Sequence, residues 1–242
     1  MKEANSTRIW EIDFLRGLAI ILMVGYHLLY DLGDFAGLER FLGLTTDLTT
    51  PAWLVAQHFF AGLFVILSGV SSNFSQNNLR RSLKYLAVAL VITAATYFFD
   101  PGSVILFGII HCLGVSALIY GLYFKKSTAV TCLTSGIIIA SLSPLLPAAH
   151  RIPALNSNWL LPLGLHRPDF ASFDYFPLIP WFGVFLVGAA LGRWLYPSRK
   201  SLFIRKLPAT IFNWCGRHSL WIYLLHQPII LGTLYLLGYV SL

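Results

Sequence analysis

One stretch decides the fold, Glu11-Ile-Asp-Phe-Leu-Arg-Gly-Leu-Ala-Ile-Ile-Leu-Met-Val-Gly-Tyr-His-Leu-Leu-Tyr-Asp31. Its apolar middle is long enough to cross a hydrocarbon core of about 30 Å as a helix, which takes about 20 residues. Apolar residues make up 57% of the chain and charged residues 11%, against about 45–50% and about 25% in soluble domains. No small-residue cleavage site follows the stretch, so we expect it to remain in the protein as a first membrane-spanning helix.

Further apolar runs of spanning length follow along the chain. With the first, they begin near Ile12, Pro51, Ser82, Val104, Thr128, Phe176 and Ser219. The sixth opens with Asp174-Tyr-Phe-Pro-Leu-Ile-Pro180, and its two prolines predict a kink or a short re-entrant entry. The longest connection, Ala148 to Tyr175, forms either a lid or short surface helices. We predict an all-α fold, a polytopic bundle of about seven transmembrane helices in a single domain over residues 1–242.

Basic residues gather in alternate connections, which indicates the topology. Lys and Arg near span ends are retained on the cytoplasmic side, and an internal N-terminus leaves only Arg40, Arg151 and Arg167 of the 17 outside. The C-terminus is then external, and we expect a multi-pass protein of the cell's inner membrane. Membrane lipid accounts for the formal charge of +7, so the charge requires no nucleic-acid partner.

Ionisable side chains form a stripe along the first predicted helix. Arg16 and His27 are 11 residues apart, which separates them by about 20° around the axis and about 16 Å along it. Asp13 and Asp31 extend the stripe at spacings of three and four residues. Such groups are expensive against lipid, so we expect the stripe to face the bundle interior or a hydrated cavity. A plainer alternative is that Asp13 and Arg16 only mark the inner membrane interface.

Imidazole groups in the apolar segments are candidates for chemistry. A carboxylate one turn from His27 can fix the imidazole tautomer and stabilise its cation, as a general base requires. A histidine hydrogen-bonded within the bundle is the competing interpretation, and it applies equally to His58, His111 and His226. Small residues around Ser68 let a helix or an extended ligand approach closely.

Metal chemistry is not indicated by the sequence. Cys112, Cys132 and Cys215 are widely spaced and fall in or beside apolar runs, so we expect them to pack rather than bind metal. There is no HExxH motif, no Cys-x-x-Cys pair and no phosphate-binding or dinucleotide fingerprint.

Three motifs resemble the acyltransferase-3 family of membrane proteins. They are Ile12–His27, where ten residues separate an arginine from a histidine, then Phe64–Gly69, then Ser219–Pro228 with a histidine near a proline. Over nearly its whole length, including Phe107–Gly114 and Phe176–Gly183, the chain is similar to bacterial proteins related to the catalytic domain of heparan-alpha-glucosaminide N-acetyltransferase. The resemblance implies transfer of an acyl group, acetyl first of all, from cytoplasmic acyl-CoA to an acceptor such as a glycan or amino sugar outside.

The reactive residue is not carried over directly. In the heparan enzyme the reactive histidine lies in the loop before the second helix, whereas Gly33 to Thr50 contains no histidine here. The resemblance therefore leaves His27, or second His58, as the reactive group. The predicted catalytic residues are His27, Asp31 and His58, and the predicted donor-binding residues are Arg16, Asp13, Ser68 and His226.

Several alternatives stay open at this stage. The imidazole either acts as a base or carries the acyl group itself. A transporter or flippase would use the same stripe to relay protons, and a non-enzymatic membrane subunit would use it for packing. The oligomeric state is open too, with a homo-oligomer among the alternatives.

Overall fold

The computed structural model describes residues 8–149, 152, 157–203 and 211–239. Within these ranges the chain is almost entirely helical, and its only strands are β1 (Arg40–Phe41) and β2 (Leu44–Thr45), a short antiparallel hairpin. The prediction of an all-α polytopic bundle is confirmed.

Among the described residues, six helices are long and apolar enough to cross a membrane. They are α1 (Trp10–Asp34), α2 (Pro51–Ser72), α3 (Asn78–Phe99), the run Ala129–Ala149 that contains α5 (Ala129–Ser141), η2 (Ser143–Leu145) and α6 (Leu146–Ala149), α7 (Leu178–Leu195) and α9 (Ser219–Leu236). The fourth expected span is a shorter apolar helix, α4 (Ile109–Ile119), which continues as a π-helix, η1 (Tyr120–Phe124). Helical geometry in α7 is interrupted at Ile179, between the two prolines that predicted a kink.

The late start of α4 has a physical cause. The segment before it pairs its backbone with the chain that leads into α7: Phe173 N donates to Ser103 O and Phe176 N donates to Phe107 O, both at 3.0 Å. This pairing holds the segment in a non-helical conformation, so the helix begins only at Ile109, whose N–H donates to Asp174 Oδ2 at 2.9 Å. An acidic group suits a helix N-terminus because the first N–H groups have no partner within the helix.

The chain divides into two compact units. The first comprises residues 1–64 and 203–242, and the second comprises residues 65–202. Each unit is described separately below, and the expectation of a single domain stays a prediction.

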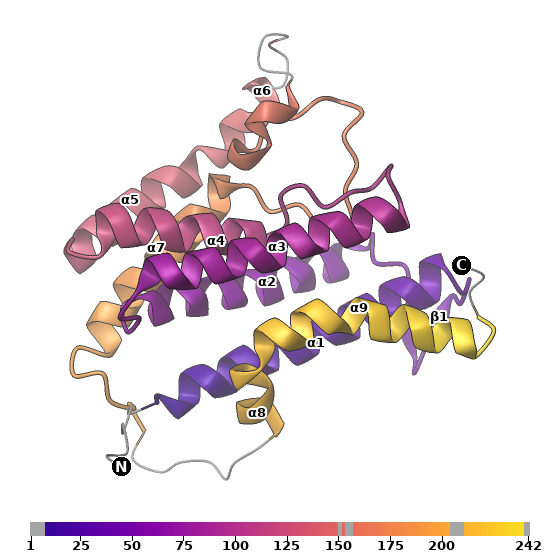
Figure 1. Ribbon diagram of the computed structural model, residues 1–242, viewed down its shortest axis with the longest axis horizontal. Helices are drawn as coiled ribbons and strands as arrows, with labels where there is room; N and C mark the ends of the chain where they lie inside the picture. The colour runs from indigo at the N-terminus through magenta and orange to yellow at the C-terminus, as the bar shows by residue number, and fades with distance from the viewer. Residues whose placement is uncertain (1–7, 150–151, 153–156, 204–210, 240–242) are drawn as a thin grey trace. The chain divides into compact units, whose positions relative to one another are not determined.

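In the first unit, α1 packs against α8 (Ile211–Arg217) and α9, with α9 running alongside α1 in Figure 1. The α1–α8 contact is between backbones: a Cβ atom on Gly17 would lie 1.8 Å from Phe212 O, and one on Gly216 would lie 1.7 Å from Asp13 O. Small residues permit such close approach between membrane helices.

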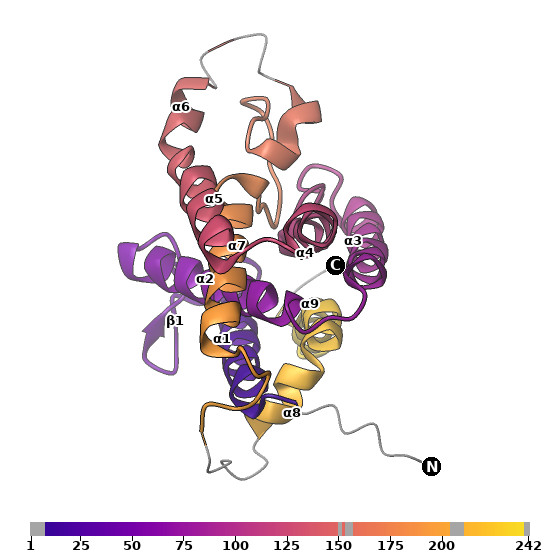
Figure 2. The ribbon, with the colours of Figure 1, turned by 90° about the vertical axis from the view of Figure 1, so that its left-hand side faces the viewer.

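The second unit is built on two helix pairs, α3 with α4 and α5 with α7, and Figure 2 shows α3 and α4 nearly end-on, side by side. Glycine again sets the separation, since a Cβ on Gly183 would lie 2.5 Å from Gly136 O. The described part of the long connection before α7 contains a short 3-10 helix, η4 (Asn158–Leu163). Tyr175 donates to Leu161 O at 2.9 Å, and burial raises the pKa of Tyr175 to about 12. Its hydroxyl therefore stays protonated at neutral pH and anchors η4.

Candidate functional site

Polar side chains from α1 and α9 meet inside the first unit. The His27 and His226 rings have centroids 4.9 Å apart, and Gln227 Nε2 donates to Asp31 Oδ1 at 3.2 Å. His27 and Asp31 lie one turn apart on α1, so two consecutive residues of α9 can reach both. We call these four residues the α1–α9 cluster. The sequence predicted three of its members, and Gln227 is the member it missed.

The hydrogen bond of His226 assigns its tautomer. His226 Nδ1 lies 2.6 Å from Tyr223 O, and because a carbonyl only accepts, Nδ1 carries the proton. In the neutral ring Nε2 then holds a lone pair, and this atom is buried without a hydrogen-bond partner among the described residues. Buried polar atoms are nearly always paired, so an exception points to a bound substrate, water or a catalytic role.

Asp31 is the second unsatisfied member of the cluster. Asp31 is fully buried, at 0% exposed. Its Oδ2 atom and the Oε1 atom of Gln227 have no hydrogen-bond partner within the described ranges. Among the same residues, the Asp31 carboxylate accepts a hydrogen bond from Gln227, and no hydrogen bond joins it to His27. The orienting role of Asp31 toward His27 therefore stays a prediction, while its burial as a carboxylate is a feature that folding alone does not favour.

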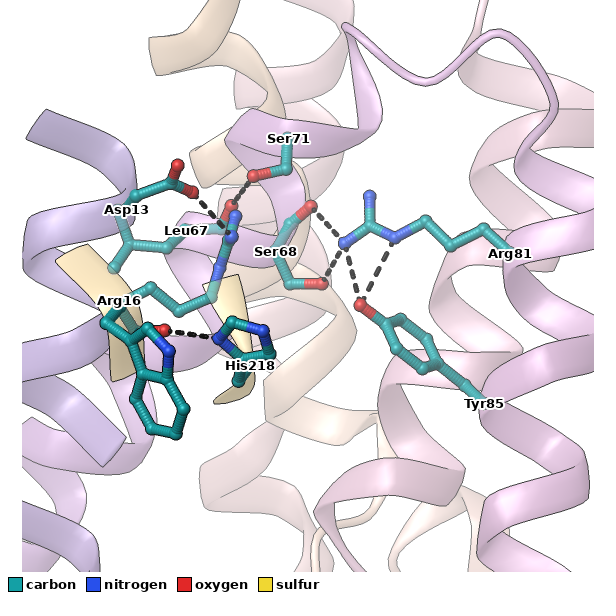
Figure 3. Close-up of polar contacts among 9 residues, drawn as sticks. Asp13, Arg16, Leu67, Ser68, Ser71, Arg81, Tyr85 and His218 are labelled. Carbon is teal, nitrogen blue, oxygen red and sulfur yellow. Dashed lines mark hydrogen bonds and ion pairs between the residues drawn. The ribbon is translucent and has the colours of Figure 1, made fainter. Parts of the chain in front are cut away.

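Asp13 and Arg16 pair near the other end of α1. Arg16 Nη1 lies 3.3 Å from Asp13 Oδ1, as Figure 3 shows, and both side chains are largely covered, at 20% exposed for Arg16 and 16% for Asp13. The four residues of the predicted stripe therefore lie on one continuous helix, α1, and their facing a hydrated path stays a prediction.

Ser68 lies in the second unit, where it binds an arginine. Arg81 Nη2 donates to Ser68 Oγ at 2.8 Å and Arg81 Nη1 to Ser72 Oγ at 2.9 Å, and Tyr85 OH accepts at 3.2 Å. Figure 3 shows the guanidinium between Ser68 and Tyr85. All these partners are neutral, so the positive charge of Arg81 is not offset by them. Sequence reasoning used Arg81 only for topology; the i, i+4 spacing of the two serines was the available signal.

The two other histidines of the predicted spans differ from the cluster. His58 is exposed and its Nδ1 contacts Leu54 O of its own helix at 2.7 Å. His111 is bonded at both nitrogens: Nδ1 accepts from Gly108 N at 3.2 Å, and Nε2 lies 3.1 Å from Thr93 Oγ1. Because the Thr93 hydroxyl donates to a carbonyl, Nε2 of His111 is the donor. His111 is therefore a structural residue at the start of α4.

The predicted site residues fall in different units. Asp13, Arg16, His27, Asp31, His58 and His226 belong to the first unit, and Ser68 belongs to the second. In the part of the chain that the structure describes, no group of three or more His, Cys, Asp and Glu side chains could hold a metal ion. The three cysteines are free and buried.

The fold and the cluster together define a class: a multi-pass helical membrane protein with unsatisfied imidazole and carboxylate atoms buried between two of its helices. The family model described as "Heparan-alpha-glucosaminide N-acetyltransferase, catalytic" matches residues 8–228, and the chain belongs to this family. No curated protein and no solved structure matches the chain. Membership implies a membrane acetyltransferase-type function, and the matched range includes the whole α1–α9 cluster.

Proposed function

We propose that this protein transfers an acetyl group from cytoplasmic acetyl-CoA to a hydroxyl or amine of a sugar at the outer side of the inner membrane. The observation that carries the proposal is the buried, unpartnered Nε2 of His226 beside the His27 ring. An acetyl transferase needs a proton acceptor that is not already engaged within the protein. The α1–α9 cluster supplies one in the segment that resembles the family's motifs.

The chemistry follows from the two imidazoles and the carboxylate. As the acceptor attacks the thioester carbonyl, its O–H or N–H proton passes to His27, with His226 Nε2 available to receive it in turn. A new C–O or C–N bond forms, the C–S bond breaks, and the thiolate leaves as CoA thiol after taking the proton. The charge of Asp31 favours the imidazolium that forms between these steps. A covalent variant, with the acetyl group held briefly on His27, uses the same residues.

Donor binding is assigned to the basic residues of the predicted cytoplasmic side. Arg16 lies about 16 Å from His27 along α1, a depth that suits the pantetheine arm of CoA. A guanidinium is suited to phosphate, although Asp13 offsets part of the charge of Arg16. Arg81, whose partners are neutral, is a second candidate for a phosphate contact, and Ser68 would act by orienting it.

The decisive experiment uses the purified full chain in liposomes with labelled acetyl-CoA and a panel of sugars and amino sugars. We expect labelled product and stoichiometric release of CoA thiol for at least one acceptor. His27→Ala should abolish both signals, whereas His166→Ala, which alters a partly exposed histidine of the connection before α7, should retain them. Transfer by His27→Ala at the wild-type rate would overturn the assignment of His27.

A transporter or flippase is the second candidate, because unsatisfied buried ionisable atoms also suit a proton relay. It differs in one measurable respect, since a transporter does not consume the thioester. Solute-coupled proton movement without CoA release, across the whole panel, would favour that alternative over acetyl transfer.

A further inference from the structure

A small cavity lies in the second unit, between the start of α3 and the π-helix η1. Its volume is about 160 Å³, and Asn78, Leu79, Gly121, Leu122 and Lys125 are among the residues that line it. An engineered cavity of about 150 Å³ holds one benzene molecule, so this space suits a group the size of a phosphate with a short polar substituent. Neither the α1–α9 cluster nor Arg81 is part of this lining.

Lys125 brings a cation to the cavity. Its Nζ donates to Ser75 O at 3.3 Å and to Gln76 O at 3.0 Å, which holds the ammonium over the turn between α2 and α3. An ammonium has three N–H donors, and these two carbonyls use two of them. The third donor and the net charge remain for an anionic ligand.

Asn78 lines the same cavity and carries an unsatisfied acceptor. Its residue is only 3% exposed, and its Nδ2 donates to Ser72 O at 3.1 Å, which fixes the orientation of the amide. Asn78 Oδ1 has no hydrogen-bond partner among the described residues. A buried acceptor without a donor is destabilising, so a ligand with an O–H or N–H group would remove a defect of the empty protein.

The electrostatic surroundings select against a cationic ligand. Arg80 and Lys126 are exposed nearby in the chain, and the only acidic residues of the second unit are Asp100, Asp169 and Asp174. Asp100 follows the far end of α3, about 33 Å from Asn78 along the helix. With no carboxylate at this end, the donor that meets Asn78 Oδ1 is better supplied by a hydroxyl than by an ammonium.

Apolar side chains continue the cavity toward the lipid. Leu79 is 52% exposed and Leu122 is 64% exposed, and both line the cavity. In a membrane protein such surfaces face acyl chains. A cavity that combines a lysine and an asparagine with leucine side chains, at the end of the unit predicted to be cytoplasmic, is suited to an amphiphile rather than a soluble ion.

We propose that this cavity binds the headgroup of an anionic glycerophospholipid with free hydroxyls, of which phosphatidylglycerol is the simplest, with its phosphodiester on Lys125 and a hydroxyl on Asn78 Oδ1. The acyl chains lie against Leu79 and Leu122. This lipid site is separate from acetyl transfer and does not depend on it.

The test is lipid retention by the full chain in native mass spectrometry, after delipidation and addition of single lipids in detergent. We expect phosphatidylglycerol to bind about threefold to tenfold more tightly than phosphatidylcholine, because both lipids carry the phosphodiester but only phosphatidylglycerol can donate a hydroxyl to Asn78 Oδ1. Lys125→Gln should weaken the binding of both lipids about tenfold, the effect of losing a hydrogen bond to a charged group, whereas Lys126→Gln, a neighbouring exposed cation outside the cavity lining, should change binding by less than about twofold. Leu122→Gln alters the exposed rim and should also weaken lipid binding. It tests the site if the Lys125→Gln protein does not fold.

Competition experiments and other lipids show whether the phosphate in the cavity belongs to a lipid, to free phosphate or to CoA. Inorganic phosphate and CoA, each in excess, should leave the bound phosphatidylglycerol in place, and displacement by CoA would assign the cavity to the donor substrate instead. Phosphatidylethanolamine binding as tightly as phosphatidylglycerol would overturn the hydroxyl assignment. Equal binding of phosphatidylglycerol and phosphatidylcholine, or binding unchanged by both cavity variants, would overturn the site.

Discussion

His226 in the first unit and His111 in the second have the same exposure, 8%, but they differ in how many ring nitrogens are hydrogen-bonded. Both nitrogens of His111 are hydrogen-bonded, to Gly108 N and Thr93 Oγ1, whereas Nε2 of His226 has no partner among the described residues. Burial alone therefore does not separate these two histidines. The number of unmet hydrogen bonds does, because a protein selected only for stability would pair or remove such an atom.

The largest predicted effect follows directly from this pair. His226→Ala should lower acetyl transfer by about 100-fold to 10,000-fold, the usual contribution of general acid–base catalysis, while thermal stability changes little because the alanine removes an unsatisfied atom. His111→Ala should instead cost about 2 kcal/mol of stability by leaving Gly108 N and Thr93 Oγ1 unpaired, with near-normal activity per folded molecule. Activity assays and thermal unfolding of both variants would measure the two effects. An unstable but active His226→Ala protein would reverse the comparison.

A second pair tests whether α1 is held rigidly where it packs on α8. A Cβ on Gly17 would lie 1.8 Å from Phe212 O, whereas a Cβ on Gly25 of the same helix meets nothing within 4 Å. Gly17→Ala should therefore cost about 3 kcal/mol through overpacking against backbone. Gly25→Ala should be neutral or stabilise by up to about 1 kcal/mol, because alanine has the higher helix propensity. Midpoints of thermal unfolding for the two variants would show the difference; equal midpoints would mean that α8 is not anchored on α1.

Most of the fold could be predicted because spanning helices depend on local composition. Hydropathy identifies each long helix without knowledge of its neighbours. The fourth span was predicted too long because its start depends on distant residues: Phe173 and Phe176 bond Ser103 and Phe107 and hold that segment extended. Such pairing has no local signal in either segment.

The candidate site likewise has a part that local sequence predicts and a part that it does not. The Asp13–Arg16 pair follows from a spacing of three residues on one helix, and the structure contains it. The contact of His27 with His226 joins helices at opposite ends of the chain, and the tautomer of His226 depends on Tyr223 O. Composition, spacing and the family resemblance therefore predicted three members of the α1–α9 cluster, while only the packing of α9 on α1 adds Gln227 and shows which nitrogen of His226 is unpaired.

The smallest predicted effect concerns two carboxylates in the connection before α7. Asp174 Oδ2 accepts from Ile109 N at the start of α4, whereas Asp169 pairs with Arg167 on the surface, where the side chains are 70% and 60% exposed. Asp174→Ala should cost about 1 kcal/mol, as loss of an N-terminal helix cap does, and Asp169→Ala should change stability by less than about 0.5 kcal/mol. Chemical denaturation in detergent would measure both. Because the two carboxylates are five residues apart, a difference between them cannot come from the net charge of the connection, and equal losses would show that the contact with Ile109 contributes nothing to the stability of α4.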